Sequence, residues 1–189
     1  MPVDVTKVIA GVATLYTAPV GTAMPADTVA EGVAWASTWV HHGATEEGIS
    51  FINGTDTNDI FVEEQSPPAR ILVSRRNVRV TFALAEDVVA SMKLSYGGGV
   101  STPVVAGTGQ PGKTTLTLSD TLDEVAVGFE AINAFGFWRR VHIPRAVSVA
   151  DVTTTYRRAT NNRSYAVELR AICASSDIKI VDKTAAATA

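Results

Sequence analysis

Apolar and polar residues alternate with a period of two in several parts of the chain. The alternation is clearest at residues 78–84 and 125–131, where every second residue is apolar. Because successive side chains of a strand point to opposite faces of a sheet, this pattern predicts strands with one buried face. The same reasoning predicts further strands at residues 49–52, 115–118, 139–143, 147–156 and 164–173.

Turn and helix signals complete the predicted fold. The polar segment 160–163 predicts a hairpin between the last two strands, and a shift of the apolar phase predicts a bulge near 150–151. One helix is predicted at 86–96, with Glu86 and Asp87 favouring its start, Val88, Val89, Met92 and Tyr96 on one face, and three glycines ending it. The sequence therefore predicts a mainly β fold, an antiparallel sandwich or barrel-like domain with one flanking helix.

Three segments are predicted to lie outside the strands. Residues 1–45 are rich in turn formers and predict an extended N-terminal arm, and residues 183–189 predict a flexible C-terminal tail after a single domain spanning 1–182. Residues 54–69 predict a long inter-strand loop. An apolar run in this loop favours docking on a neighbouring subunit over local packing, with the candidate contact residues Asp59, Ile60, Phe61, Val62, Glu63 and Glu64.

Charge is distributed unevenly along the chain. Residues 1–69 hold nine acidic residues and one basic residue, whereas residues 70–189 hold fifteen basic and ten acidic ones. Such asymmetry fits contacts between unlike faces of neighbouring copies, although a solvated acidic surface explains it equally well. Six arginines are candidate subunit-contact bases: Arg75, Arg76, Arg139, Arg140, Arg157 and Arg158. Nearby aromatic residues leave single-stranded nucleic-acid binding as an alternative for them.

The sharpest motif is the segment 107–114, which matches the phosphate-binding pattern G-x-x-x-x-G-K-T. A true phosphate loop must open a helix, whereas the residues that follow alternate like a strand. Pro111 also removes one of the N–H groups that would hold a phosphate. We therefore expect a glycine-rich turn between strands rather than a nucleotide site.

Other potential sites for chemistry are weak. His41, His42 and His142 lack partners at ligand spacing and are expected to be surface or interface residues. The lone Cys173 falls in an apolar alternation and is expected to be a small buried residue. No stretch is apolar enough to span a bilayer. The sequence predicts no catalytic site, no metal and no cofactor.

Several segments resemble major tail tube proteins of long-tailed, siphovirus-type phages, particularly those of actinobacterial hosts. They are the stretch 15–27 (LYTAPVGTAMPAD), 43–49 (GATEEGI), 70–86, the glycine run 96–99 and 138–145 with its Ile143-Pro144-Arg145. The resemblance covers most of residues 10–173. It implies a β-sandwich or barrel-like subunit with a flanking helix and no enzymatic activity.

The resemblance also implies an assembly. Such subunits form hexameric rings that stack into a hollow tail tube, made in the host cytoplasm and built around a tape-measure protein. Tail terminator and tail tip proteins lie at the ends, and the genome passes through the lumen. A lumen that lets DNA slide should be neutral or acidic, and the candidate lumen acids are Glu46, Glu47, Glu63 and Glu64. A tail terminator, the tube of a contractile injection system and a nucleotide-binding enzyme remain the alternatives.

Overall fold

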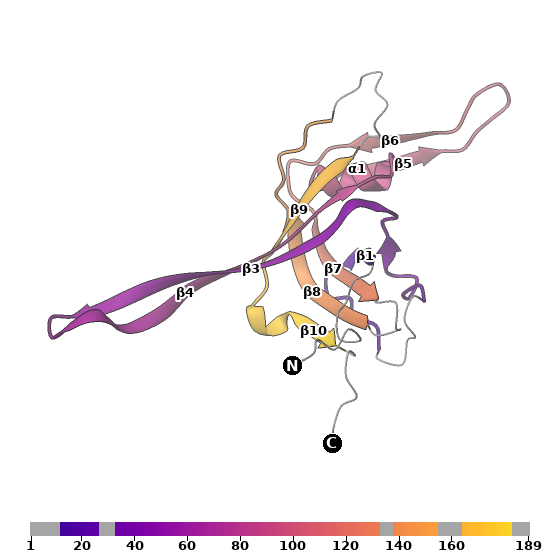
Figure 1. The fold of residues 1–189 in the computed structure, drawn as a ribbon. Helices are drawn as coiled ribbons and strands as arrows, with labels where there is room; N and C mark the ends of the chain where they lie inside the picture. The colour runs from indigo at the N-terminus through magenta and orange to yellow at the C-terminus, as the bar shows by residue number, and fades with distance from the viewer. Residues whose placement is uncertain (1–11, 27–32, 133–137, 155–163, 183–189) are drawn as a thin grey trace.

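The computed structural model describes residues 12–26, 33–132, 138–154 and 164–182 (Figure 1). Most of these residues lie in antiparallel strands, and they contain one α-helix, α1 (Val89–Ser95). The prediction of a mainly β, antiparallel fold with one helix is therefore confirmed. The strands are β1 (Ala13–Pro19), β2 (Val40–His41), β3 (Thr45–Val62), β4 (Gln65–Leu84), β5 (Val100–Val104), β6 (Lys113–Thr117), β7 (Glu124–Ile132), β8 (Trp138–Ser148), β9 (Tyr165–Ala171) and β10 (Lys179–Asp182).

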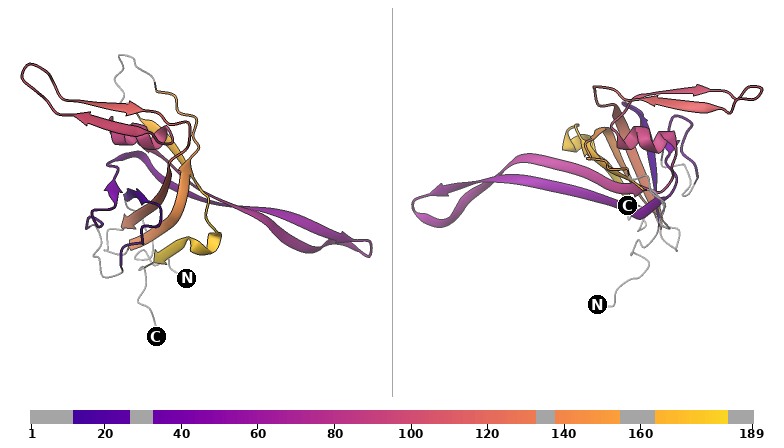
Figure 2. Two further views of the ribbon diagram at one scale, coloured as in Figure 1. Left: turned by 180° about the vertical axis from the view of Figure 1, so that it is seen from behind. Right: turned by 90° about the horizontal axis from the view of Figure 1, so that it is seen from above.

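One large sheet forms the body of the protein. Its strands run in the order β2-β1-β7-β8-β9-β4-β3, and β10 adds to β8. Strands β5 and β6 form a separate two-stranded ribbon that projects beside α1 (Figure 2). The body therefore carries two projections, the ribbon on one side and the β3–β4 hairpin on the other.

The core lies against the apolar face of the large sheet. Alternate residues of the period-two segments are buried there, as their pattern predicts. The main cluster consists of Leu15, Val78, Val80, Phe82, Leu84, Leu94, Val127, Phe129, Val141, Ile143, Ala146, Tyr165, Val167 and Leu169. Cys173 is half-buried and packs against this cluster, as expected for a small apolar residue.

The face with which the helix covers this core matches the predicted one only in part, at Met92. Its buried residues are Ser91, Leu94 and Ser95, whereas Val88 precedes the helix and is exposed. Small serines allow the helix to approach the sheet closely, and the Ser148 hydroxyl donates a hydrogen bond of 3.2 Å to the Ser95 carbonyl. Three glycines with positive φ, at 97–99, end the helix as predicted.

The structure differs from the predicted strands in two places, the end of β8 and the additional strand β5. Strand β8 ends at Ser148, so residues 149–154 do not continue the strand and the predicted bulge at 150–151 is wrong. Strand β5 was not predicted, because its residues are all exposed and show no alternation of burial. The turn predicted at 160–163 and the C-terminal tail lie outside the described residues.

The segment predicted as an N-terminal arm contributes directly to the sheet. Strand β1 pairs with β7 over seven residues and with β2, so it is an internal strand rather than an arm. Trp35 stacks on Tyr16 with ring centroids 4.4 Å apart. Trp39 meets the Trp35 ring edge-on at 4.9 Å. The two tryptophans form a second apolar cluster with Tyr16, Ala18 and Ala126, on the face of β1 and β7 opposite the main core.

A glycine makes this packing possible. A Cβ atom added at Gly128 would overlap the Trp35 ring. We expect Gly128→Ala to lower the free energy of unfolding by about 1–3 kcal/mol, because overpacking forces the indole out of its site. Urea denaturation followed by tryptophan fluorescence measures this loss. The matched control is Gly107→Ala, where an added Cβ meets nothing within 4 Å; an equal loss in both variants would contradict the explanation.

Candidate assembly surfaces

The segment predicted as a long loop, 54–69, is instead the outer part of a long β-hairpin. Strands β3 and β4 pair from Thr45 and Leu84 out to Val62 and Gln65, and Glu63 and Glu64 form the turn. Eighteen residues of extended chain span roughly 55 Å. The hairpin therefore reaches far beyond the body of the sheet (Figures 1 and 2).

The loop prediction was wrong because this hairpin tolerates residues that a central strand excludes. Strand β4 pairs with β9 only over residues 79–84, so its outer part has one free edge. Pro67 and Pro68 lie where the β3–β4 register shifts, between the pairs Ile60–Arg70 and Val62–Gln65. Prolines are accepted at edges and irregular positions because no ladder hydrogen bond is lost there.

The outer hairpin exposes apolar side chains on both of its faces. Two runs of three consecutive apolar residues lie on opposite strands, Ile60-Phe61-Val62 and Ile71-Leu72-Val73, and all six are exposed, Phe61 by 64%. Consecutive residues of a strand point to opposite faces, so each run places apolar groups on both sides. A strand that is apolar on both faces is typical of one covered on both faces.

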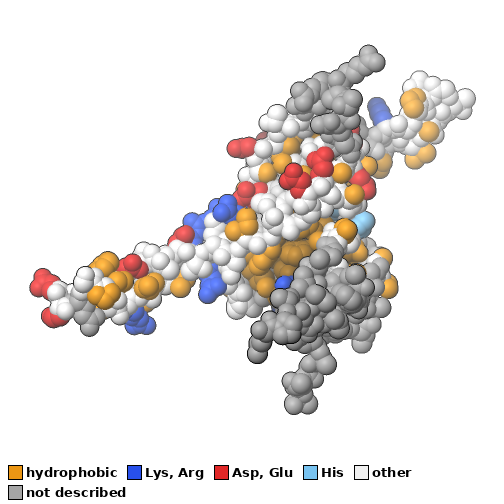
Figure 3. All heavy atoms as spheres, in the orientation of Figure 1, with side chains coloured by type: hydrophobic (Ala, Val, Ile, Leu, Met, Phe, Trp, Pro, Cys, Tyr) orange, Lys and Arg blue, Asp and Glu red, His pale blue; other side chains and the backbone are white. Residues whose placement is uncertain are grey.

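The charged residues of the hairpin are separated along its length. Glu63 and Glu64 lie at its turn, whereas Arg75 and Arg76 lie nearer the body, opposite Asp56 and Thr55. Figure 3 shows most of the acidic groups at the end of the hairpin and most of the basic groups near its base. The exposed Arg70 is a base near the end, and Asp56 is an acid opposite Arg75. The side chains of Glu63, Glu64, Arg75 and Arg76 are all exposed and are available for contacts with another molecule.

Arg140 does not lie on the surface, and its assignment as a subunit-contact base is wrong. It is fully buried and pairs with Glu130, with Nη2 and Nε 2.6 and 2.9 Å from Oε2. Its guanidinium group lies 4.3 Å from the centre of the Trp138 ring and 5.3 Å from that of Trp35. Breaking a buried pair of this kind leaves an uncompensated charge, so the arginine serves the fold of its own chain.

The same guanidinium group holds the segment after β1. Arg140 Nη1 donates to the carbonyl oxygens of Pro25 and Ala26, at 3.3 and 3.4 Å. Arg139, by contrast, is exposed and pairs with Asp182 of β10 at 2.5 Å. Arg157 and Arg158 lie outside the described residues. Of the six candidate bases, the structure therefore leaves Arg75, Arg76 and Arg139 at the surface.

The candidate lumen acids fall into two separate groups. Glu46 and Glu47 lie at the body end of β3, a full strand length from Glu63 and Glu64. Glu47 lines a groove together with Asp151 and Glu168, which the sequence analysis did not single out. Glu168 lies on β9, on the face opposite the core, where its carboxylate accepts a hydrogen bond of 3.2 Å from Arg79. The groove brings together acids from three distant parts of the sequence.

The glycine-rich segment 107–114 forms a turn between β5 and β6, as expected. Gly107 and Gln110 exchange two backbone hydrogen bonds of 3.0 and 3.1 Å, and Gly109 has a φ of 75°. Lys113 begins strand β6 rather than a helix. The segment therefore lacks the helix N-terminus that a phosphate site requires.

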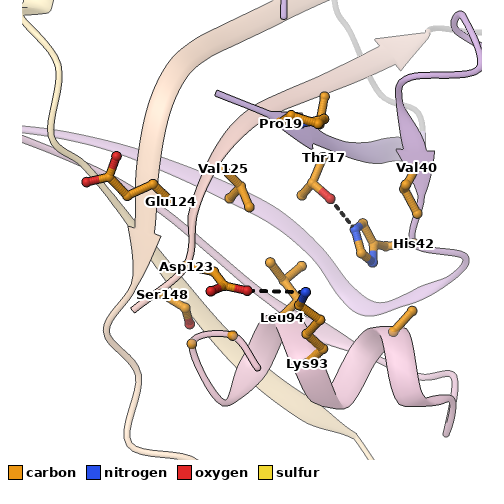
Figure 4. Close-up of a pocket in the computed structure, with 14 residues that line it drawn as sticks. Thr17, Pro19, Val40, His42, Lys93, Leu94, Asp123, Glu124, Val125 and Ser148 are labelled. Atoms are coloured by element: carbon orange, nitrogen blue, oxygen red, sulfur yellow. Dashed lines mark hydrogen bonds and ion pairs between the residues drawn. The ribbon is translucent and has the colours of Figure 1, made fainter. Parts of the chain in front are cut away.

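A pocket of about 410 Å³ lies between β1, α1 and the start of β7 (Figure 4). Its polar side chains engage one another: Thr17 Oγ1 and His42 Nε2 share a hydrogen bond of 2.6 Å, and Lys93 Nζ lies 3.2 Å from Asp123 Oδ2. Apolar residues form much of the remaining wall. The pocket therefore offers an apolar surface rather than a catalytic arrangement.

Two of the three histidines are buried, so their assignment to the surface is wrong. His42 and His142 are both less than a tenth exposed, and His142 Nε2 lies 3.1 Å from the Thr22 carbonyl oxygen. Burial, with a smaller contribution from the neighbouring His41, lowers the pKa of His42 from its ordinary value of 6.5 to about 4. Burial likewise lowers the pKa of His142. Both rings therefore fold in their neutral form.

Among the residues that the structure describes, no cluster of three or more histidine, cysteine or acidic side chains is placed to hold a metal ion. The helix in the described part of the chain is too short to cross a membrane.

Burial of His42 predicts a loss of stability in acid. Between pH 6.5 and 4 the unfolded chain protonates this ring while the folded chain does not, so acid favours unfolding. We expect the free energy of unfolding to fall by up to about 3 kcal/mol across this window because of His42. Urea denaturation at several pH values should show a flatter profile in His42→Gln. The exposed His41→Gln is the control, and identical profiles for His42→Gln and the unmodified chain would contradict the prediction.

Comparison with known proteins finds a matching family model and 12 matching chains of solved structures. The family model described as phage tail tube protein matches residues 3–169. No curated protein matches the chain. Among solved structures, the chain is similar to a chain in the cryo-EM structure of the anti-feeding prophage (AFP) baseplate, 6-fold symmetrised. That likeness has a TM-score of 0.42 and 10% sequence identity, and it covers 96% of this chain and 97% of the other.

Proposed function

The chain belongs to the phage tail tube protein family, and we propose that its copies close into hexameric rings that stack into the tail tube of a siphovirus-type phage. The family is structural rather than enzymatic, which makes the protein a component of a phage tail. In the proposed function the stacked rings enclose a channel that conducts the genome to the host. The subunits are made in the host cytoplasm before assembly.

The observation that carries this proposal is the projecting β3–β4 hairpin. Its outer residues expose apolar groups on both faces. In the described residues the hairpin pairs with another strand, β9, only at residues 79–84 of β4. A two-stranded ribbon alone is only marginally stable in water. Contacts with neighbouring copies cover these apolar groups, and the candidate contact residues Asp59 to Glu64 lie at the end of the hairpin.

The channel wall is assigned to the polar face of β3, β4 and β9. Core-facing residues of these strands alternate with small or polar ones such as Thr81 and Ala166. Glu47, Asp151 and Glu168 add negative charge to this face. Arg79, which pairs with Glu168, and Arg170 lie on the same face, so its net charge is close to neutral. A neutral or acidic wall does not bind the phosphate backbone and lets the genome slide, whereas a wall with an excess of lysine and arginine would hold it.

Other tail proteins complete the proposed assembly. A tape-measure protein occupies the lumen before the genome does, and a tail terminator and a tail tip protein meet the two ends of the tube. The candidate contact bases between subunits remain Arg75, Arg76 and Arg139, since each lies in a strand and has an exposed side chain.

A charge at the centre of the apolar run tests the role of the hairpin. We expect Phe61→Asp to abolish tubes, because assembly would bury an unpaired carboxylate against apolar groups. Negative-stain microscopy of the purified chain measures tube formation. Circular dichroism should be unchanged, since Phe61 packs outside the core cluster of the chain.

The matched control is Phe61→Leu, which keeps an apolar side chain at the same position. We expect it to form tubes as the unmodified chain does. Tubes of normal length and number from Phe61→Asp would show that the end of the hairpin is not an assembly contact.

The charge of the channel wall is tested by a structure of the assembled tube at side-chain resolution. We expect Glu47 and Glu168 to face the bore, and Arg75, Arg76 and Arg139 to lie at subunit contacts or on the outer surface. A bore lined by those three arginines would contradict the proposed electrostatics.

A further inference from the structure

The β5–β6 ribbon is a second projection that the chain leaves uncovered. Its strands pair only with each other among the described residues, and every side chain from 100 to 117 is exposed except the half-buried Leu116. Val100 is 65% exposed, and Val105, next to β5, is 90% exposed. Because an isolated two-stranded ribbon is marginal in water, a partner that covers these valines would stabilise it.

The charge of the ribbon complements the charge of the hairpin end. Lys113 is the only charged residue between positions 97 and 119. The hairpin end, residues 59–70, holds Asp59, Glu63 and Glu64 against the single base Arg70. Both projections therefore expose apolar groups, and the ribbon is positively charged where the hairpin end is negatively charged. Complementary charge of this kind favours one docking partner over others.

The two projections point away from opposite sides of the body in every view (Figures 1 and 2). The hairpin of one copy therefore meets a ribbon only on another copy. A contact between two unlike surfaces repeats from copy to copy, and it produces either a closed ring or an open stack. Both outcomes suit a tube protein.

The pocket beside α1 fits the hairpin end less well. Its lysine, Lys93, already pairs with Asp123, and the second acid of the lining, Glu124, pairs with Arg145. The described residues of the pocket therefore offer no uncompensated basic group to meet the acidic turn of the hairpin. The ribbon, by contrast, has a lysine for which no ion pair with its own chain is seen in the described residues.

From these observations we infer that the β5–β6 ribbon is the surface on which the end of the β3–β4 hairpin of another copy of this chain docks. The valines of the ribbon cover the apolar run at 60–62, and Lys113 faces the acids of the turn. This inference rests on the proposed function, in which the hairpin end is an assembly contact, and it names the surface that the hairpin meets.

A charge exchange tests the pairing. We expect Lys113→Glu to slow assembly about tenfold at low salt, and the double change Glu63→Lys with Glu64→Lys to restore the rate when combined with it. Light scattering follows assembly, and circular dichroism confirms that each variant folds. The control is Lys179→Glu on β10, because this exposed lysine lies away from both projections. The double change at 63 and 64 should not raise the assembly rate of the Lys179→Glu chain. A Lys113→Glu chain that assembles normally, or one that the double change leaves slow, would overturn the inference.

Disulfide crosslinking supplies an independent readout. In a Cys173→Ala background, Phe61→Cys combined with Val105→Cys should yield a ladder of linked chains when assembled tubes are oxidised. A ladder that stops at six chains places the contact within a ring, and a longer one places it between rings. Phe61→Cys combined with Ile180→Cys, on β10, should give no ladder beyond dimers.

The outcomes separate the inference from the proposed function. Tubes that require Phe61 but give neither a ladder nor a charge rescue would show that the hairpin docks elsewhere, so the inference would fail while the proposed function stands. A folded chain that forms no tubes under any condition would refute both.

Discussion

The hydrogen bonding of β4 is the constraint on which the rest of the structure depends. Over residues 79–84 this strand pairs with β9 on one side and with β3 on the other, which anchors it in the sheet. Beyond that point β3 is its only partner among the residues that the structure describes, and the two strands leave the body together. The apolar residues that they carry, such as Phe61 and Leu72, cannot reach the core of their own chain. In the proposed assembly, neighbouring copies bury them.

The body is built to hold the base of this hairpin rigidly. The apolar residues of the outer hairpin lie far from the main core, whereas Val80 and Phe82 at its base are part of that core. On the opposite side of the sheet, the buried Glu130–Arg140 pair fixes the segment after β1. A rigid body with two uncovered projections favours repeated contacts between identical copies over the binding of a small molecule.

The sequence predicted the parts of the fold whose residues alternate and whose partners are apolar. Residues 78–84 and 125–131 were predicted as strands because one face of each is buried in this chain. The outer hairpin was missed since Gly54 and the prolines at 67 and 68 are tolerated at a free edge, and β5 was missed since nothing in the chain covers it. In both segments the chain buries neither face, so the alternation that reveals a half-buried strand is absent.

The candidate residues, too, could be assigned from the sequence only where the local pattern was sufficient. Phe61 was singled out because an apolar run among acids has no local explanation, and the structure shows it exposed at the end of the hairpin. The turn at 107–114 was recognised because no helix follows it. Arg140 was misplaced because its burial depends on Glu130 across the β7–β8 pair and on Trp35 from a distant segment. The register of two predicted strands would have revealed the charge pair, since Glu130 and Arg140 are directly opposite each other.

The central claim is that the outer hairpin is completed by assembly. Hydrogen–deuterium exchange of the backbone amides at 55–76, measured in the unassembled chain and in tubes, tests it most directly. The free edge and the marginal stability of a two-stranded ribbon predict fast exchange in the unassembled chain and strong protection in the tube. The same exchange rates in both states would contradict the account.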